Sequence, residues 1–441
     1  MTISKKEAFF YWLKLGFISF GGPAGQIAIM HHDLVEKKRW ISEKRFLHAL
    51  NYCMLLPGPE AQQLAIYIGW LMHRTWGGVV AGTLFILPAF FILVGLAWVT
   101  LSFGHLPVVA GALAGIKPVV VAIILVALHR IGARTLKNGL MWAIAFFAFV
   151  GIFFFKLPYP LIILSAALVG FLGQKFKSDY FALSGGHAKA AQTFGAAIID
   201  DDTPTPPHAI FSWQKIFKVL AIGLGLWCVC FAYLFLKFGW QGAFTQIAWF
   251  FTKAALLTFG GAYAVLPYVY QGAVEHYGWL NIGQMMDGLA LGETTPGPLI
   301  MVVTYVGFVA GWTQQVFENA PLLSAFTAAS IVTFFTFLPS FIFIFLGAPV
   351  IESTHNQLKF TAPLSAITAA VVGVILNLAL FFAEHVLWKN GIGDVPNWQA
   401  IDLKTLAMML IAYIVLFRFK VNVIWLILTF ATLGAMSNLL A

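Results

Sequence analysis

The sequence predicts an all-α polytopic membrane protein with an inverted-topology internal repeat and broken, re-entrant helices, and three observations support this. Of its 441 residues, 60% are hydrophobic and only 10% are charged, whereas soluble domains carry about 25% charged residues. The apolar runs are long and numerous enough to cross a bilayer several times. One stretch also occurs twice, and the residues that its copies share include helix breakers inside apolar runs.

The repeated stretch covers residues 14–59 and residues 253–298, which align without a gap at a constant shift of 239. Eleven of the 46 aligned positions are identical, and many of them are glycine, proline or tryptophan. The identical residues of the first copy are Lys14, Phe20, Gly21, Gly22, Val35, Glu36, Trp40, Leu50, Pro57, Gly58 and Pro59. This pattern indicates an internal duplication.

Each copy reads as two units of helix, break and helix. The first apolar stretch covers about 13 residues, or roughly 20 Å, which is too short for a hydrocarbon core of about 30 Å. Gly-Gly-Pro at 21–23 ends this stretch, and Pro-Gly-Pro at 57–59 ends the next, because proline disrupts a helix interior. The half-length helices of the first copy are expected at 8–20, 23–31, 43–56 and 59–73.

The other apolar runs complete the two halves. Ordinary spans are expected near 79–102, 108–128, 140–155, 158–174, 214–238, 322–347, 363–387, 403–417 and 421–440, and the second pair of broken units near 246–271 and 281–312. The segment between the halves is polar and rich in aspartate and proline, a composition typical of a flexible linker. The expected divisions are a first repeat (1–174), a cytoplasmic polar linker (175–212), a connecting transmembrane helix (213–240) and an inverted second repeat (241–441).

The distribution of lysine and arginine favours broken units that turn back over units that cross. If every unit crossed, inside loops would hold 14 of these residues and outside loops 9, whereas re-entrant hairpins give 19 and 4. Positive charge concentrates on the cytoplasmic side, so hairpins are preferred. Either arrangement inverts the second half, because the extra span near 214–238 makes the number of crossings between the copies odd. We expect a multi-pass inner-membrane protein with a cytoplasmic N-terminus and no cleavable signal peptide.

The breaks are predicted to bind a small anion. A helix that starts at membrane depth offers unpaired N–H groups and the positive end of its dipole, and broken helices in inverted repeats are a recurring plan of secondary transporters. The candidate substrate-binding residues are Ser19, Phe20, Gly21, Gly22, Pro23, Pro57, Gly58, Pro59, Thr258, Phe259, Gly260, Gly261, Thr295, Pro296, Gly297 and Pro298. The alternative is that glycine and proline only kink tightly packed helices.

Four charged residues near the breaks are candidates for charge compensation or coupling. Lys14 and Lys253 occupy equivalent positions before the double glycines, where an ammonium is costly enough to suggest a function. Both side chains could instead extend to the membrane interface. Glu60 and Glu293 are the acidic residues nearest the breaks and could take up a proton, although Glu60 could also stabilise the dipole of its own helix.

No motif points to catalysis or to a bound metal. The sequence lacks a Walker A loop, a dinucleotide fingerprint, a nucleophile elbow and the kinase motifs, so we expect neither an enzyme nor an ATP-driven pump, and no cofactor. His31, His32 and Asp33 lack the spacing of a metal site. The net charge of +9 fits loops on anionic lipid and requires no nucleic acid. Trp40 and Trp279 are expected as interfacial anchors.

These motifs resemble the chromate ion transporter family in its long, two-domain form. The resemblance rests on Phe-Gly-Gly-Pro at 20–23 and Leu-Pro-Gly-Pro at 56–59, with Thr-Phe-Gly-Gly at 258–261 and Thr-Pro-Gly-Pro at 295–298, and it covers essentially the full length. It implies chromate efflux and chromate resistance, with sulfate as the structural mimic. The second double glycine is followed by alanine and tyrosine where the first is followed by proline, so the two sites need not be equal.

Several alternatives stay open at this point. The protein could transport sulfate or another small anion, or be an anion channel, and a membrane enzyme is the less favoured reading. Chromate and sulfate are tetrahedral dianions of similar size, so hydrogen-bond geometry alone hardly separates them. The sequence does not fix the coupling ion, the stoichiometry, the direction of transport or the oligomeric state, for which a homodimer is one option.

Overall fold

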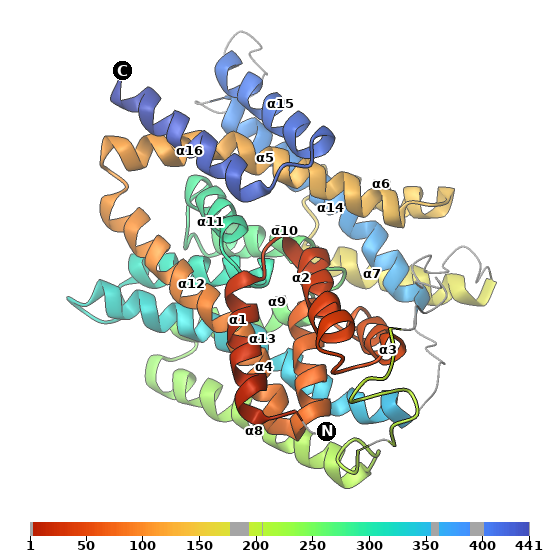
Figure 1. Ribbon diagram of the computed structural model, residues 1–441. Coiled ribbons are helices and arrows are strands. Elements are labelled where there is room, and N and C mark those ends of the chain that lie inside the picture. Colours follow the sequence, from red (N-terminus) through yellow and green to blue (C-terminus); the bar gives the residue numbers. More distant parts are fainter. Residues whose placement is uncertain (1–2, 177–193, 205, 354–360, 389–400, 441) are drawn as a thin grey trace.

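A computed structural model shows the protein as an assembly of helices joined by loops (Figure 1). The structure describes residues 3–176, 194–204, 206–353, 361–388 and 401–440. These ranges contain no strand, and their only β-type pairing is an isolated bridge between Ile41 and Ile199. The all-α fold predicted from the sequence is therefore confirmed.

The first half of the chain folds in the order that its breaks predict. Its first helix ends before the double glycine, and its third ends shortly before Pro-Gly-Pro. The elements are α1 (Lys5–Ile18), α2 (Gly22–His31), η1 (His32–Lys37), α3 (Glu43–Cys53), α4 (Glu60–Phe103), α5 (Pro107–Thr135), α6 (Gly139–Phe153) and α7 (Tyr159–Phe176).

The second half repeats this order after the connecting helix α8 (Trp213–Phe238). Its elements are α9 (Ala243–Leu256), α10 (Ala262–Tyr270), η3 (Gln271–His276), α11 (Ile282–Thr294), η4 (Leu299–Met301), α12 (Val302–Gln314), α13 (Pro321–Ser353), α14 (Thr361–Leu387), α15 (Leu403–Arg418) and α16 (Val423–Leu439). Even the π-helical turns η1 and η3 coincide under the shift of 239. The duplication seen in the sequence is thus also present in the backbone.

The first broken pair of each copy turns back on itself. In the first copy, Lys38 forms an ion pair with Glu7 (2.8 Å), so the chain after η1 returns to the start of α1. In the second copy, Tyr277 donates a hydrogen bond to Gln246 (3.0 Å) at the equivalent positions. Each first pair therefore forms a helical hairpin, and its re-entry into the membrane from one side stays a prediction.

The tryptophans at the ends of these hairpins are buried, so the expectation that they anchor the membrane interface is wrong. Trp40 and Trp279 are each 3% exposed. The Lys38 ammonium lies 4.6 Å from the ring centroid of Trp40, and Tyr277 stacks on Trp279 at 4.3 Å. Each indole therefore fills the inside of its hairpin and supports the residue that closes it.

The helix that follows the second break of each copy is itself followed by a reversal of the chain. α4 reverses at His73 and Arg74, whose backbone angles are not helical. Ile66 before this reversal lies beside Gly78 and Gly82 after it, so the two parts of α4 run antiparallel. In the second copy, α12 and α13 pack closely against each other in the equivalent place.

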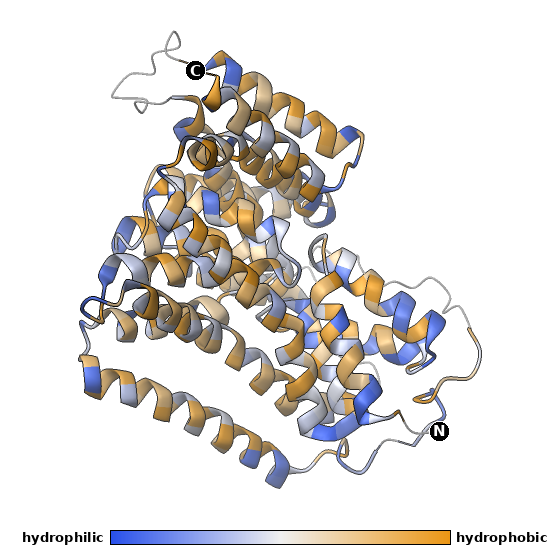
Figure 2. Cartoon of the chain, turned by 60° about the vertical axis from the view of Figure 1, so that its left-hand side comes forward, coloured by the Kyte–Doolittle hydropathy of each residue, from blue (hydrophilic) through white to orange (hydrophobic). Residues whose placement is uncertain are grey.

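Within the described part of the chain, five helices are long and apolar enough to cross a membrane. They are Glu60–Phe103, Pro107–Thr135, Trp213–Phe238, Pro321–Glu352 and Ala362–Leu387. Several shorter apolar helices accompany them, including α6, α7 and α16. Apolar residues dominate most helices, and polar residues gather at helix ends and loops (Figure 2). The chain is therefore a multi-pass membrane protein, in agreement with its composition.

The last three helices of each repeat form one six-helix bundle, made of α5, α6, α7, α14, α15 and α16. α5 packs on α15 and α16, and α14 packs on α6 and α7. Gly434 lies against the backbone of Gly111, and in the equivalent contact Gly170 lies against the backbone of Ala362. If these two contacts are equivalent, Gly111 of α5 corresponds to Ala362 of α14, a shift of 251. Gly170 of α7 then corresponds to Gly434 of α16, a shift of 264.

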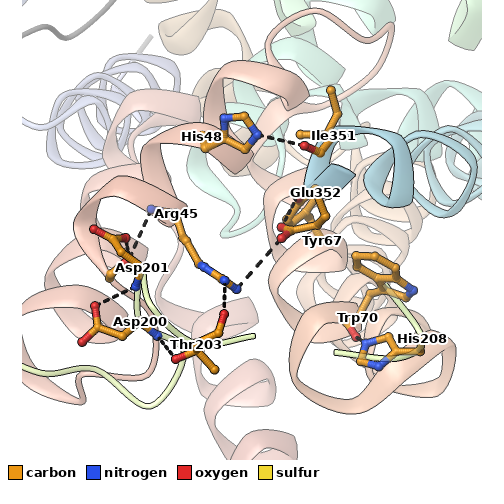
Figure 3. A network of polar contacts seen from close by, with 11 residues as sticks. Arg45, His48, Tyr67, Trp70, Asp200, Asp201, Thr203, His208, Ile351 and Glu352 are labelled. Carbon is orange, nitrogen blue, oxygen red and sulfur yellow. Dashed lines mark hydrogen bonds and ion pairs between the residues drawn. The ribbon is translucent and has the colours of Figure 1, made fainter. Parts of the chain in front are cut away.

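The described residues between 194 and 212 pack against the first repeat, although their composition predicts a flexible linker (Figure 3). Arg45 donates a hydrogen bond to the carbonyl of Thr203 (2.6 Å), and Nε2 of His208 lies 2.9 Å from the carbonyl of Trp70. Hydrogen bonds between side chains and backbone carbonyls therefore hold this polar segment against the first repeat.

Arg45 also joins the two repeats. Its Nη1 atom lies 4.0 Å from the carboxylate of Glu352 near the end of α13, and that carboxylate accepts a hydrogen bond from Tyr67 (2.6 Å) (Figure 3). Nε2 of His48 lies 3.3 Å from the carbonyl of Ile351. The end of α13 is therefore fixed on the same side as the positively charged loop after α2.

Inverted hairpins place equivalent residues on opposite faces of the membrane. In protein whose native cysteines (Cys53, Cys228 and Cys230) are replaced by serine, we expect Lys37→Cys to react with an impermeant thiol reagent only from the cytoplasmic side. The equivalent variant His276→Cys should react only from the other side, and both native residues are exposed. Labelling of right-side-out and inverted vesicles checks this. Reaction of both cysteines from one side would contradict the inverted topology.

Candidate functional site

The four breaks meet between the two repeats, where they exchange backbone hydrogen bonds. The N–H of Gly58 donates to the carbonyl of Thr258 (2.7 Å), and the N–H of Gly297 donates to the carbonyl of Ser19 (2.8 Å). Gly58 and Gly297 are equivalent under the shift of 239, and so are Ser19 and Thr258. Each Pro-Gly-Pro break is therefore fixed to the double-glycine break of the other repeat.

The hydroxyl groups beside the breaks bind the backbone of their own helices. Ser19 and Thr258 are fully buried and donate hydrogen bonds to the carbonyls of Leu15 and Ala254, each at 2.6 Å. Thr295 likewise donates to a carbonyl of its own helix (3.0 Å). In this arrangement the hydroxyls satisfy carbonyls at the helix ends and are not free donors for a ligand.

The two Pro-Gly-Pro glycines are tightly packed. A Cβ atom on Gly58 would lie 2.6 Å from the hydroxyl of Ser340, and one on Gly297 would lie 2.9 Å from Cβ of Ala89. Gly58 and Gly297 also have positive φ angles of 126° and 99°. Both positions therefore require glycine, for close approach and for backbone conformation.

The double glycines, by contrast, border open space. Gly21 and Gly260 are exposed, and a Cβ atom on Gly21, Gly22 or Gly261 would meet no atom within 4 Å. α2 and α10 begin beside these glycines, and the first N–H groups of a helix have no acceptor within it. Donors and the positive ends of two helix dipoles are thus available to an anion here.

Three buried glutamines lie around the breaks, and the sequence analysis did not single them out. Gln26 donates to the carbonyls of Gly297 (2.6 Å) and Ser19 (3.2 Å), and Gln63 donates to a carbonyl of its own Pro-Gly-Pro break (2.8 Å). Gln62 is fully buried, and within the described residues neither its amide nitrogen nor its amide oxygen has a partner. Buried polar groups are normally hydrogen-bonded, so Gln62 is a candidate contact for a bound solute.

The signal for these glutamines was present in the sequence. All three are amides within or beside apolar helices, and the equivalent positions of the second repeat carry Val265, Met301 and Val302. These three buried amides therefore come from the first repeat alone, although the backbone is symmetric.

Glu60 and Glu293 lie within electrostatic reach of two arginines beyond the end of the span expected near 108–128. Arg134 attracts the carboxylate of Glu60, and Arg130 attracts that of Glu293, which also accepts a hydrogen bond from Tyr263. The expected span near 108–128 is too short, because α5 continues through both arginines without a proline to end it. Their spacing of four residues puts both on one face of α5.

The structure does not bring Lys14 and Lys253 together at the breaks. Lys14 is exposed, and Lys253 lies 5.7 Å from the ring centroid of Trp249. Lys253 lines a separate cavity of about 480 Å³, together with Gln246 and Gln314. Lys253 therefore lies in polar surroundings of its own, which the cavity provides beside α9.

Comparisons with known proteins agree with the motifs. The family profile described as chromate transporter matches residues 6–171 and 245–435. A chromate transport protein of Pseudomonas aeruginosa is 32% identical over 395 residues, which is 87% of this chain and 83% of that protein. A chromate transport protein of Cupriavidus metallidurans is 28% identical over 410 residues, which is 93% of this chain and 88% of that protein. No solved structure matches this chain significantly.

A shorter relative also matches. An uncharacterized transporter of Bacillus subtilis, YwrB, is 32% identical over 143 residues, which is 32% of this chain but 73% of that protein. The family profile covers both repeats, and the relatives named chromate transport protein span most of both chains. The chain therefore belongs to the chromate transporter family.

Proposed function

We propose that this protein is a secondary transporter that exports chromate, or a similar tetrahedral dianion, across the inner membrane and so confers chromate resistance. The observation that carries the proposal is the reciprocal hydrogen bonding of the breaks, which holds four helix ends at one interface. Broken helices at a repeat interface bind the substrate in other secondary transporters. Two relatives carry the name chromate transport protein, which supports chromate as the substrate.

In this proposal the dianion binds beside the double glycines. The first N–H groups of α2 and α10 donate hydrogen bonds to it, and both helix dipoles add positive potential. Gln62 supplies an amide from the first repeat, and Arg130 and Arg134 supply full positive charges nearby. Gly58 and Gly297 hold the frame and do not touch the anion, because their N–H groups are already bonded.

The membrane potential favours the proposed direction. Export of a dianion from a cell that is negative inside is favoured by about 2.3 kcal/mol per charge for each 100 mV. Voltage alone can therefore drive export, and Glu60 and Glu293 offer a route by which a proton could also be coupled. Sulfate should compete, because a site of N–H donors discriminates poorly between tetrahedral dianions of similar size.

Gly58→Leu and Gly297→Leu should each lower chromate uptake by about tenfold or more, since strain of about 1–3 kcal/mol at the break corresponds to such a factor in rate. The variants should still reach the membrane. Uptake into inverted vesicles, normalised to protein amount, measures this. Gly95→Leu is the matched control, because no atom lies within 4 Å of a Cβ there. Normal uptake by either break variant would show that transport does not depend on the frame that these two glycines hold.

Glu293→Gln should remove the dependence of uptake on an imposed pH gradient while counterflow exchange persists. A carboxamide can still accept the hydrogen bond from Tyr263 but cannot take up a proton. Glu60→Gln tests the other carboxylate in the same way, and Glu318→Gln, at an exposed loop position, is the control. If neither Glu60→Gln nor Glu293→Gln alters the response to the pH gradient, these carboxylates do not couple protons.

Flux of radiolabelled chromate into inverted vesicles tests the function itself. We expect saturable uptake that unlabelled sulfate suppresses, and the response to a protonophore will separate proton-driven from voltage-driven transport. Counterflow would exclude an anion channel, which lacks alternating access. Absence of flux in folded protein would point to another anion or to a function outside transport.

A further inference from the structure

The two symmetric hairpins are covered to different extents. In α10 every residue except Tyr263 is buried, whereas in the equivalent helix α2 only Gln26 and Met30 are buried. The double glycine before α2 borders open space on both residues, while Gly260 before α10 has a neighbour. One hairpin is therefore closed and the other is open.

The six-helix bundle is what covers the second hairpin. α14 packs on α10, while α5 and α16 pack on α11 (Figure 1). Within the described residues, the equivalent packing of α5 on α2, and of α14 and α7 on α3, is absent beyond isolated contacts. The six-helix bundle thus packs against the hairpin of the second repeat only. The hairpin of the first repeat is left uncovered on its side of the protein.

The open side carries the positive charges that mark the cytoplasm. The loop after α2 holds Lys37, Lys38 and Arg39, and Arg45 follows at the start of α3. Positive charge concentrates on the cytoplasmic side of membrane proteins. On this assignment of sides, the structure corresponds to an inward-open state.

The internal symmetry predicts which residues would come into contact if the six-helix bundle packed against α2 instead of α10. The shift of 251 makes Lys117 of α5 the equivalent of Thr368 of α14. Thr368 lies 3.4 Å from a Cβ position on Gly260, whose equivalent in the first repeat is Gly21. In the present state the Lys117 ammonium lies 3.3 Å from a Cβ position on Gly283 of α11. The mirrored packing would bring Lys117 to the open double glycine.

The same symmetry pairs a second set of residues. The rings of Tyr270 and Phe381 lie 4.7 Å apart where α10 meets α14. The equivalent of Tyr270 is His31, and the equivalent of Phe381 is Arg130. Where the second repeat closes with two aromatic rings, the first repeat would close with an imidazole and a guanidinium.

The surroundings of His31 suit a guanidinium. One ring nitrogen of His31 lies 3.2 Å from the carboxylate of Glu36, and the other contacts Glu43. Nδ1 of His32 lies 2.7 Å from Glu36, and this hydrogen bond holds the pKa of Glu36 below its usual value. Two carboxylates thus stand where Arg130 would arrive, and a guanidinium bonds well to carboxylates.

We propose that, in the outward-open state, α5 closes over α2, with Lys117 against Gly21 and Arg130 against the cluster of His31, Glu36 and Glu43. This inference rests on the proposed transport function, because only a transporter must visit both states. Arg130 exchanges the carboxylate of Glu293 for those of the cluster as the bundle moves. Closure of the cytoplasmic side is therefore electrostatic, whereas closure of the other side uses aromatic contacts.

The test is a cross-linking experiment on the full chain, reconstituted in liposomes with its native cysteines replaced by serine. A short bifunctional thiol reagent should join His31→Cys to Arg130→Cys. The link is detected directly by mass spectrometry and not by transport, because Arg130→Cys also removes a positive charge near the proposed anion site. A chain that carries Tyr270→Cys and Phe381→Cys should also be cross-linked, because this pair is already in contact. In a chain with both pairs, the Tyr270–Phe381 link should prevent the other.

The matched control combines His31→Cys with His129→Cys. His129 is next to Arg130 on α5, but its ring packs on Phe417 of α15 at 4.8 Å, so it should not be linked. Failure of the His31–Arg130 link, in protein whose Tyr270–Phe381 pair does react, overturns the proposed closure whatever the transport activity. Absence of flux in the cysteine-free parent would instead count against the transport function.

A charge exchange provides a second, independent readout. Arg130→Glu should reduce transport severalfold by repelling the cluster, whereas Arg130→Lys should reduce it less. Adding Glu36→Arg to Arg130→Glu should recover part of the loss, because the pair is then attractive again. A double variant no better than Arg130→Glu alone would contradict the contact between these residues.

Discussion

The constraint on which the structure depends is the need of broken backbone inside a membrane for hydrogen-bond partners. An unsatisfied backbone group in hydrocarbon costs several kcal/mol, and lipid offers no replacement. Here each repeat supplies what the other lacks, through Gly58 to Thr258 and Gly297 to Ser19. Neither repeat alone satisfies these breaks, which explains why the two copies lie face to face. The glycines at the tips follow from the same contact, because any side chain would separate the two backbones.

This pairing divides the breaks into two classes. The Pro-Gly-Pro breaks direct their N–H groups at the other repeat and are buried, so they determine geometry. The double glycines keep open space beside the first turns of α2 and α10. A structural frame and an accessible set of donors are thus built from the same kind of residue, and only the packing around each glycine tells them apart.

The course of the backbone could be predicted from the sequence, but fewer of the side chains at the site could be. Repeated breakers and short apolar runs predicted the half-length helices, because a run of about 13 residues cannot span a bilayer. Arg130 and Arg134 lie beyond the end of the span expected near 108–128, because hydropathy falls where polar residues gather, although a helix can continue through arginine. Gln62 was missed because it belongs to no recognised motif, although its counterpart in the second repeat is the apolar Met301. The docking of residues around Thr203 depends on contacts with a distant part of the chain, which composition does not record.

The asymmetry between the two hairpins also lies beyond motif analysis, since a duplicated motif predicts two equal environments. At the ends of the two hairpins, the copies differ in charge. Lys38 bonds to Glu7 in the first hairpin, and Tyr277 bonds to Gln246 in the same geometry in the second. One backbone arrangement thus accommodates an ion pair on the side rich in lysine and arginine and a neutral hydrogen bond on the other. Arg130 at the position equivalent to an aromatic ring follows the same rule. After duplication, the membrane face that a residue meets constrains its charge, whereas its place in the fold constrains its backbone.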